Sequence, residues 1–155
     1  MMPGMAETDT THRFESTASW KGDGAGSGEI RVSDGRFAVP IAGATSLGGS
    51  GGKANPEELL LSAIAACFSN TWAIFLKKLA VPYDTPAVRV TGELGADPAG
   101  GFRMEKAVVH ASVPAAVLAA DRAKIEKTLA LAEKYCIVSK VARAAMPLSV
   151  EIVES

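Results

Sequence analysis

The 155-residue sequence predicts an α+β domain in which a largely antiparallel sheet surrounds one long, central, buried helix. Its expected elements run strands, helix, strands, helices, strand, unlike the regular alternation that builds a doubly wound parallel sheet. A helix is expected over residues 56–79, and its part 59–76 is apolar or small on nearly every side, as a covered helix must be. With 48% hydrophobic residues the chain can fill one core, so we expect a single domain over residues 12–155 after a flexible tail, residues 1–11.

Short alternating runs predict strands near the start of the chain. Residues 13–20 alternate with a period of two, which is typical of a half-buried strand. Residues 29–32 and 36–41 flank Ser33-Asp34-Gly35, and an Asp-Gly pair between short apolar runs favours a hairpin. We therefore expect a meander, followed over residues 43–53 by a glycine-rich connector that matches no phosphate-binding fingerprint.

The central helix has a clear start. Asn55 can act as the N-cap, Pro56 suits the first helical position, and Glu58 completes an asparagine version of the capping box. The helix should end before Pro82. A helix this long needs cover on several sides, and one chain of this size supplies little, so we expect two protomers to pack these helices together.

The second half of the sequence predicts two further strands, two helices and a closing strand. Residues 88–92 and 104–113 are the strand candidates, and residues 121–135 have the apolar stripe of an amphipathic helix. A shorter helix over residues 138–145 and a strand over residues 148–153 complete the chain.

Charge and cysteine content limit the function classes. Sixteen basic and 17 acidic residues give a net charge of −1, which offers no electrostatic footprint for nucleic acid or an anionic membrane. The apolar run 59–68 is shorter than the roughly 20 residues that cross a bilayer. Two cysteines are too few for a secreted disulfide framework, and no leader pattern opens the chain, so we expect a cytoplasmic protein with a small neutral or apolar ligand.

The two cysteines each allow a structural and a chemical interpretation. Cys67 lies within the central helix, where a buried structural cysteine is common. Cys136 lies at a helix junction, where the free N–H groups of the next segment could stabilise a thiolate. Reduction of a peroxide needs a thiolate and a nearby second thiol, and only the fold can bring together cysteines that are so far apart in the sequence.

Glu57 and the two histidines are the other candidates for chemistry. In a regular helix the ten-residue interval from Glu57 to Cys67 spans about 15 Å, so Glu57 would serve the thiol of a partner helix, or simply favour the helix dipole. His12 lies in the tail, and His110 lies in an expected strand with no cysteine or acidic residue at ligand spacing, so no metal site is expected at either.

The segment from Asn55-Pro56-Glu57-Glu58 to Ala65-Ala66-Cys67-Phe68 resembles the OsmC/Ohr family, the osmotically inducible and organic hydroperoxide resistance proteins. The likeness extends to Ser33-Asp34-Gly35, Leu47-Gly48-Gly49 and Cys136-Ile137-Val138-Ser139. Its specific features are Asn-Pro-Glu, a cysteine ten residues after the glutamate, and a late cysteine with serine at the third position after it.

The resemblance implies an intertwined α+β homodimer that reduces organic hydroperoxides, lipid hydroperoxides among them, in oxidative or osmotic stress defence. Cys67 would be the peroxidatic cysteine that becomes a sulfenic acid, and Cys136 the resolving thiol that forms a disulfide with it. A glutamate that matches Glu57 pairs with an arginine that keeps the peroxidatic thiol ionised. The resemblance implies no bound metal, flavin or haem, and a dithiol electron donor such as a lipoylated protein.

The sequence departs from the family pattern in two places. The family arginine is missing from residues 24–28 and from residues 43–52. The proline that usually follows the late cysteine is replaced by Ile137. The cations that could substitute for the arginine are Arg13, Arg31, Arg36 and Lys53. The missing arginine keeps a second hypothesis open, a noncatalytic ligand-binding or redox-sensing dimer of the same fold.

Overall fold

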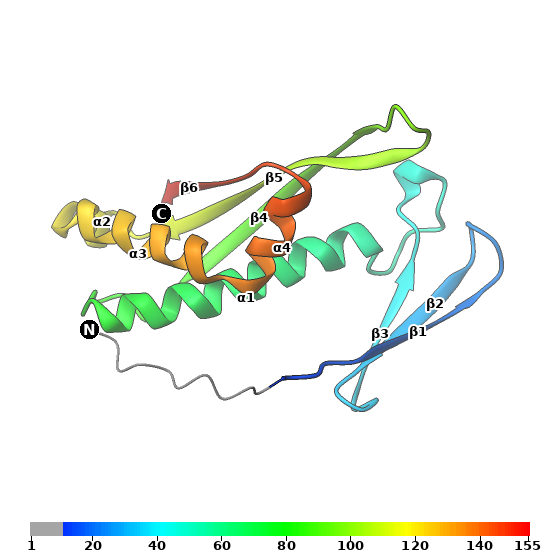
Figure 1. Cartoon of the computed structure of the whole chain (residues 1–155), viewed down its shortest axis with the longest axis horizontal. Helices are drawn as coiled ribbons and strands as arrows, with labels where there is room; N and C mark the ends of the chain where they lie inside the picture. The colour runs from blue at the N-terminus through cyan, green and yellow to red at the C-terminus, as the bar shows by residue number, and fades with distance from the viewer. Residues whose placement is uncertain (1–10) are drawn as a thin grey trace. The chain divides into compact units, whose positions relative to one another are not determined.

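The computed structural model describes residues 11–155, and these belong to two compact units that meet in sequence between Pro56 and Glu57. Each unit contains one three-stranded sheet, and the second also contains most of the helical residues (Figure 1). The predicted α+β class is therefore confirmed. The predicted tail lies outside the described residues except for Thr11.

The first unit is the predicted meander. Strands β1 (Ser16–Lys21), β2 (Ser27–Val32) and β3 (Phe37–Ala42) pair antiparallel in chain order. The β2–β3 turn has positive φ at Ser33, Asp34 and Gly35, the backbone region that Asp-Gly turn sequences tolerate best.

The glycine-rich connector after β3 is a packed loop. It contains a short 3₁₀ helix, η1 (Thr45–Leu47), and an isolated bridge pairs Ile41 with Ala54. A side chain at Gly49 would place its Cβ 2.1 Å from the Gly43 carbonyl oxygen, so the close approach of the two backbone segments requires glycine there.

The second unit combines one antiparallel and one parallel strand pair. Strand β5 (Phe102–Val113) lies between β4 (Ala87–Ala96), which is antiparallel to it, and β6 (Leu148–Glu154), which is parallel. A parallel pair needs a long crossover, and here three helices supply it. They are α2 (Ala115–Ala120), α3 (Arg122–Tyr135) and α4 (Ile137–Ala145), of which α2 was not predicted.

Helix α1 (Pro56–Lys78) has the predicted start and packs one face into the core of the second unit (Figure 1). The buried residues on that face include Ile64, Phe68 and Trp72, which follow each other at intervals of four. They belong to one cluster with alternate residues of β5 and with the apolar stripe of α3. The Trp72 Nε1–H donates to the buried Thr128 hydroxyl of α3 at 3.0 Å, which ties the two helices together.

The opposite face of α1 is left uncovered by the rest of the second unit. Leu60 and Ile74, seven residues to either side of Cys67, are 41% and 45% exposed. By length and composition the helix is apolar enough to cross a membrane, because an 18-residue window within it has a mean hydropathy of 1.8, although the ten-residue run alone is too short. The core helix of a soluble protein passes the same test, and 28% of the apolar window is buried within this chain.

Candidate thiol site

The fold brings the two cysteines of the second unit into contact. Cys67 lies in the middle of α1 and is half-buried, whereas Cys136 is fully buried at the junction of α3 and α4. Both thiols are free, and each lies close enough to shift the pKa of the other. The packing of α1 against the α3–α4 junction therefore brings together two cysteines whose proximity the sequence alone left undecided.

Cys136 forms the corner between the two helices. Its N–H donates to the Ala132 carbonyl at 2.8 Å and ends α3, while its own carbonyl accepts from the Lys140 N–H at 3.1 Å and starts α4. Its backbone angles, φ −64° and ψ 114°, are extended and break the helix there. The corner therefore directs the first turn of α4 at the two sulfur atoms.

One N–H group in the first turn of α4 is bound to a cysteine sulfur. The first N–H groups of a helix lack carbonyl partners within that helix. The Ser139 N–H donates to the Cys136 sulfur at 3.4 Å. The backbone groups of Val138 and Ile137 act to lower the pKa of the Cys67 thiol. The sequence predicted that these groups would favour a thiolate at Cys136, whereas here they also favour one at Cys67.

These contacts lower the pKa of the Cys67 thiol. Burial alone would raise it, but hydrogen bonds from the Val138 N–H, the Cys136 side chain and the Ile137 N–H outweigh burial and bring it below its ordinary value of 9.0. The hydroxyl of Thr71, one turn along α1, makes the smallest contribution, and it also donates to the Cys67 carbonyl at 2.8 Å. Cys67 is therefore the thiol that ionises first.

The pKa of Cys136 moves in the opposite direction. Burial raises it, and so do the hydrogen bond and the negative charge of Cys67, while the side chain and N–H of Ser139 act to lower it. The net effect places the pKa above 9.0. As the pH rises, Cys136 therefore keeps its proton longer than Cys67 does.

Ser139 is a polar residue of the site that sequence reasoning used only as a family marker. It is fully buried. Its Oγ has no partner at hydrogen-bonding geometry within residues 11–155, but the side chain acts to lower the pKa of the neighbouring Cys136 thiol. Its position three residues after Cys136, in the first turn of a helix, was the signal that could have revealed it.

Glu57 occupies the first turn of α1, as expected from the sequence. The helix is uninterrupted from there to Cys67, so the ten intervening residues span about 15 Å and separate the two side chains within one chain. The Glu57 Oε2 is buried and has no hydrogen-bond partner in the described part of the chain. Its service to the thiol of a partner chain remains a prediction.

The four candidate cations all belong to the first unit. Arg13 and Arg31 form ion pairs with glutamates two residues away, at 3.0 and 2.6 Å, and Arg36 donates to the Ser33 carbonyl. Within residues 57–155 the groups that set the pKa of Cys67 are backbone N–H groups and uncharged side chains. The groups of the second unit that lower the pKa of the Cys67 thiol therefore include no arginine.

His110 is held by hydrogen bonding in the sheet. Its Nε2 lies 2.9 Å from the Thr91 hydroxyl and its Nδ1 lies 3.5 Å from the Glu151 carboxylate. His12 is exposed. Among residues 11–155, no three His, Cys, Asp or Glu side chains are grouped so that they could hold a metal ion.

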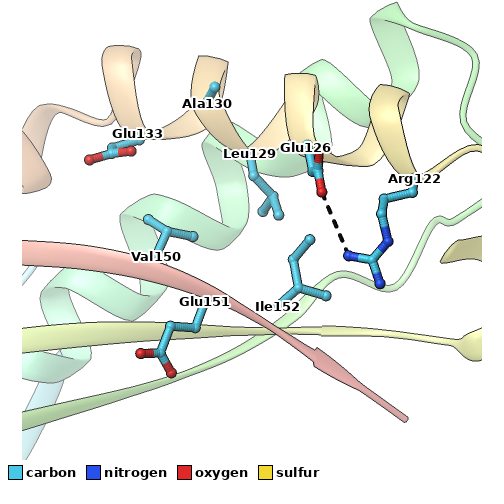
Figure 2. A pocket seen from close by; sticks show the side chains of 8 residues that line it. All are labelled: Arg122, Glu126, Leu129, Ala130, Glu133, Val150, Glu151 and Ile152. Atoms are coloured by element: carbon cyan, nitrogen blue, oxygen red, sulfur yellow. Dashed lines mark ion pairs between the residues drawn. The ribbon is translucent and has the colours of Figure 1, made fainter.

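A groove of about 610 Å³ lies between α3 and β6, on a part of the second unit that neither cysteine lines. Figure 2 shows its mixed walls, in which Leu129, Val150 and Ile152 alternate with charged side chains. The Arg122–Glu126 ion pair, 3.6 Å long, spans part of its rim. The groove is therefore separate from the thiol site.

Comparison with known proteins places the chain in a family. The solved structures similar to it include an organic hydroperoxide resistance protein from Legionella pneumophila, at 22% identity and a TM-score of 0.73, covering 92% of this chain and 98% of that one. OhrB, the organic hydroperoxide resistance protein of Bacillus subtilis, is 23% identical, with a TM-score of 0.67 and coverage of 90% and 98%. An OsmC-like protein from Mycoplasma pneumoniae is 17% identical, with a TM-score of 0.76 and coverage of 94% and 99%.

At these identities the solved structures support the fold alone, and the family is shown by the match of the sequence to a family model. No curated protein matches the chain. The family model described as OsmC-like protein matches residues 49–151, a span that includes α1, both cysteines and almost all of the second unit. The chain therefore belongs to the OsmC-like family, as its central motif indicated.

Proposed function

We propose that the protein is a thiol peroxidase that reduces organic hydroperoxides to alcohols, with Cys67 as the peroxidatic cysteine and Cys136 as the resolving cysteine. The observation that carries the proposal is the contact between two free thiols whose pKa values move in opposite directions. Membership of the OsmC-like family, whose solved relatives include proteins named for organic hydroperoxide resistance, supports it.

In the first step the Cys67 thiolate attacks the distal oxygen of the hydroperoxide. The O–O bond breaks, the alkoxide takes a proton from water and leaves as the alcohol, and Cys67 becomes a sulfenic acid. The sulfur loses two electrons and the peroxide gains them. The lowered pKa of Cys67 raises the fraction of thiolate, the attacking form, at a given pH.

The second step uses the change of charge at Cys67. Once Cys67 is an uncharged sulfenic acid, its negative charge no longer raises the pKa of Cys136, whereas the lowering contacts of Ser139 remain. Cys136 then loses its proton and attacks the Cys67 sulfur. The S–O bond breaks, hydroxide takes up a proton and leaves as water, and the disulfide forms.

A dithiol returns the disulfide to two thiols by exchange, and becomes a disulfide itself. A lipoylated protein has this chemistry, and no bound cofactor is needed in the cycle. A reducing compartment keeps both thiols free between cycles, so we place the protein in the cytoplasm.

Exposed apolar side chains next to the thiols favour an organic substrate over hydrogen peroxide. Ile137 and Val141 are one turn apart on α4 and are 72% and 70% exposed. The uncovered face of α1 adds Leu60 and Ile74 on either side of Cys67. An alkyl group beside the sulfur gains hydrophobic contact there, which hydrogen peroxide lacks.

The uncovered face of α1 also supports a homodimer in which a second copy of the chain packs against it. Such a copy would bring a partner's Glu57 region near Cys67 and give Glu57 Oε2, which has no hydrogen-bond partner in the described part of the chain, a place in the thiol site. Light scattering should give about twice the 16.0 kDa mass of one chain. A monomer at micromolar concentration would contradict this part of the proposal.

Steady-state turnover tests the proposed function. Purified protein with dihydrolipoamide should consume cumene hydroperoxide at least about tenfold more efficiently, as kcat/KM, than hydrogen peroxide, because of the apolar contact. A monothiol reductant serves as the control for the dithiol requirement. No hydroperoxide consumption by the wild type would reject the peroxidase and leave the noncatalytic or sensing dimer.

A further inference from the structure

The hydroxyl of Ser139 lacks the bond that hydroxyl groups on helices commonly make. Within α1, Ser69 and Thr71 each donate to the carbonyl four residues earlier, both at 2.8 Å. Such a bond satisfies the hydroxyl without any further partner. Ser139 is fully buried in the first turn of α4, but its Oγ has no hydrogen-bond partner among residues 11–155. A buried hydroxyl in this state costs free energy.

The corner at Cys136 separates this hydroxyl from its usual backbone acceptors. The carbonyl four residues before Ser139 belongs to Tyr135, the last residue of α3, which lies on the other side of the corner. The carbonyl three residues before it belongs to Cys136 and already accepts from the Lys140 N–H at 3.1 Å. The other acceptor that Cys136 offers at this helix end is its sulfur.

The geometry of the first helical turn directs the Ser139 side chain toward that sulfur. Cys136 is the N-cap residue of α4, and its Sγ accepts the Ser139 N–H at 3.4 Å. In a helix the Cα–Cβ bond tilts toward the N-terminus, so a side chain in the first turn lies toward the cap. In agreement with this placement, both the side chain and the N–H of Ser139 act to lower the pKa of Cys136.

The groups that pack around Cys136 from other elements do not favour its ionisation. Cys67 on α1 opposes it, because its negative charge raises the pKa of Cys136. The residues of β5 and β6 in the surrounding core cluster are apolar. The charged residues of α3 and α4 beside the corner are exposed or paired with each other at 3.1 Å: Lys134 and Lys140, and Arg143 with Glu133.

We propose that Ser139 is the positioning residue of the resolving cysteine, and that its N–H and its hydroxyl together hold the Cys136 sulfur as a thiolate for attack. This rests on the peroxidase function proposed above and concerns its second step. Cys136 loses its proton, and its sulfur attacks the Cys67 sulfenic acid and is oxidised as the sulfenic sulfur is reduced. The S–O bond breaks, hydroxide takes up a proton and leaves as water, and the disulfide forms. Ser139 keeps its own proton throughout.

The variant Ser139→Ala removes the hydroxyl and keeps the N–H that donates to the sulfur. Because the hydroxyl has no partner in the described part of the chain, its loss should not lower the thermal unfolding midpoint. Ser69→Ala is the matched control, since it removes a hydroxyl that is bonded to the Ala65 carbonyl. That control should form the disulfide at the wild-type rate.

The first readout is the rate at which the sulfenic acid becomes the disulfide after one equivalent of cumene hydroperoxide, followed by rapid quenching and mass spectrometry. At pH 7 this rate should fall about tenfold in Ser139→Ala, as for the loss of one hydrogen bond to a charged group, while the sulfenic acid forms as fast as before. The pH midpoint of the step should rise by about one unit, and the rates should converge at higher pH. An equal loss at every pH would indicate a structural role and overturn the proposal.

The second readout needs no peroxide. The chain has two cysteines, so in Cys67→Ser the remaining one is Cys136, and the chemical shift of its carbon-13-labelled Cβ reports its ionisation across pH. Adding Ser139→Ala should raise that midpoint by about one pH unit. An unchanged midpoint would overturn the proposal, as would disulfide formation by Ser139→Ala at the wild-type rate. If the wild type consumes no hydroperoxide, this midpoint alone decides the inference, so the two proposals fail separately.

Discussion

Replacement of Cys67 by serine is expected to reduce hydroperoxide consumption to the background rate, a loss of at least about 10³-fold in kcat/KM. The substitution exchanges the sulfur atom for a smaller oxygen and leaves the rest of the side chain unchanged. The serine hydroxyl does not ionise near neutral pH, and the donors that favour the Cys67 thiolate cannot supply the missing nucleophile. The expected loss is therefore chemical and not structural.

The thermal unfolding midpoint separates the two kinds of loss. Cys67 is half-buried at the edge of the core cluster, so Cys67→Ser should change the stability of the fold by no more than about 1 kcal/mol. Ser62→Ala on the exposed side of α1 is a matched control that should retain full turnover. Undiminished peroxide consumption by Cys67→Ser at wild-type stability would remove Cys67 from the mechanism.

Cys136→Ser is expected to separate the two chemical steps. Cys67 still has the N–H groups of Ile137 and Val138, so it should react with one equivalent of hydroperoxide and release one equivalent of alcohol. The sulfenic acid then lacks its resolving thiol, and steady turnover with the dithiol should fall by roughly two orders of magnitude. Excess peroxide should drive Cys67 on to the sulfinic acid, which the dithiol does not reduce.

A burst assay checks this result. The wild type should show continuous turnover, and Cys136→Ser a burst equal to the concentration of protein followed by a slow phase. Ser139→Ala is an informative companion, because it removes a hydroxyl that lowers the pKa of Cys136 and leaves both thiols in place. Steady turnover of Cys136→Ser at the wild-type rate would show that Cys136 does not resolve the sulfenic acid.

Local signals in the sequence predicted the elements that local interactions build. The start of α1 follows from Asn55 and Pro56, and the β2–β3 hairpin follows from Asp34 and Gly35, whose turn conformation their own backbones favour. Helix α2 was missed because its six residues carry no side-chain cap, and Asp121 instead caps the helix that follows through the Lys124 N–H.

The site itself depends on tertiary structure and could be predicted only in part. Two cysteines 69 positions apart in the sequence meet because α1 packs against the α3–α4 junction. The sequence pattern indicated that the N–H groups after Cys136 could favour a thiolate. It did not indicate that they would act on Cys67 as well, since that depends on the backbone direction at the Cys136 corner. The parallel β5–β6 pair likewise follows from the crossover of three helices, which no local pattern specifies.

The most direct test of the account is the bond that forms when the reduced wild-type protein receives one equivalent of cumene hydroperoxide without reductant. Peptide mapping by mass spectrometry should find a disulfide between Cys67 and Cys136 of the same chain, with loss of both free thiols and release of one equivalent of cumyl alcohol. Thiols that remain free after the peroxide is added, or a disulfide that joins two chains, would contradict it.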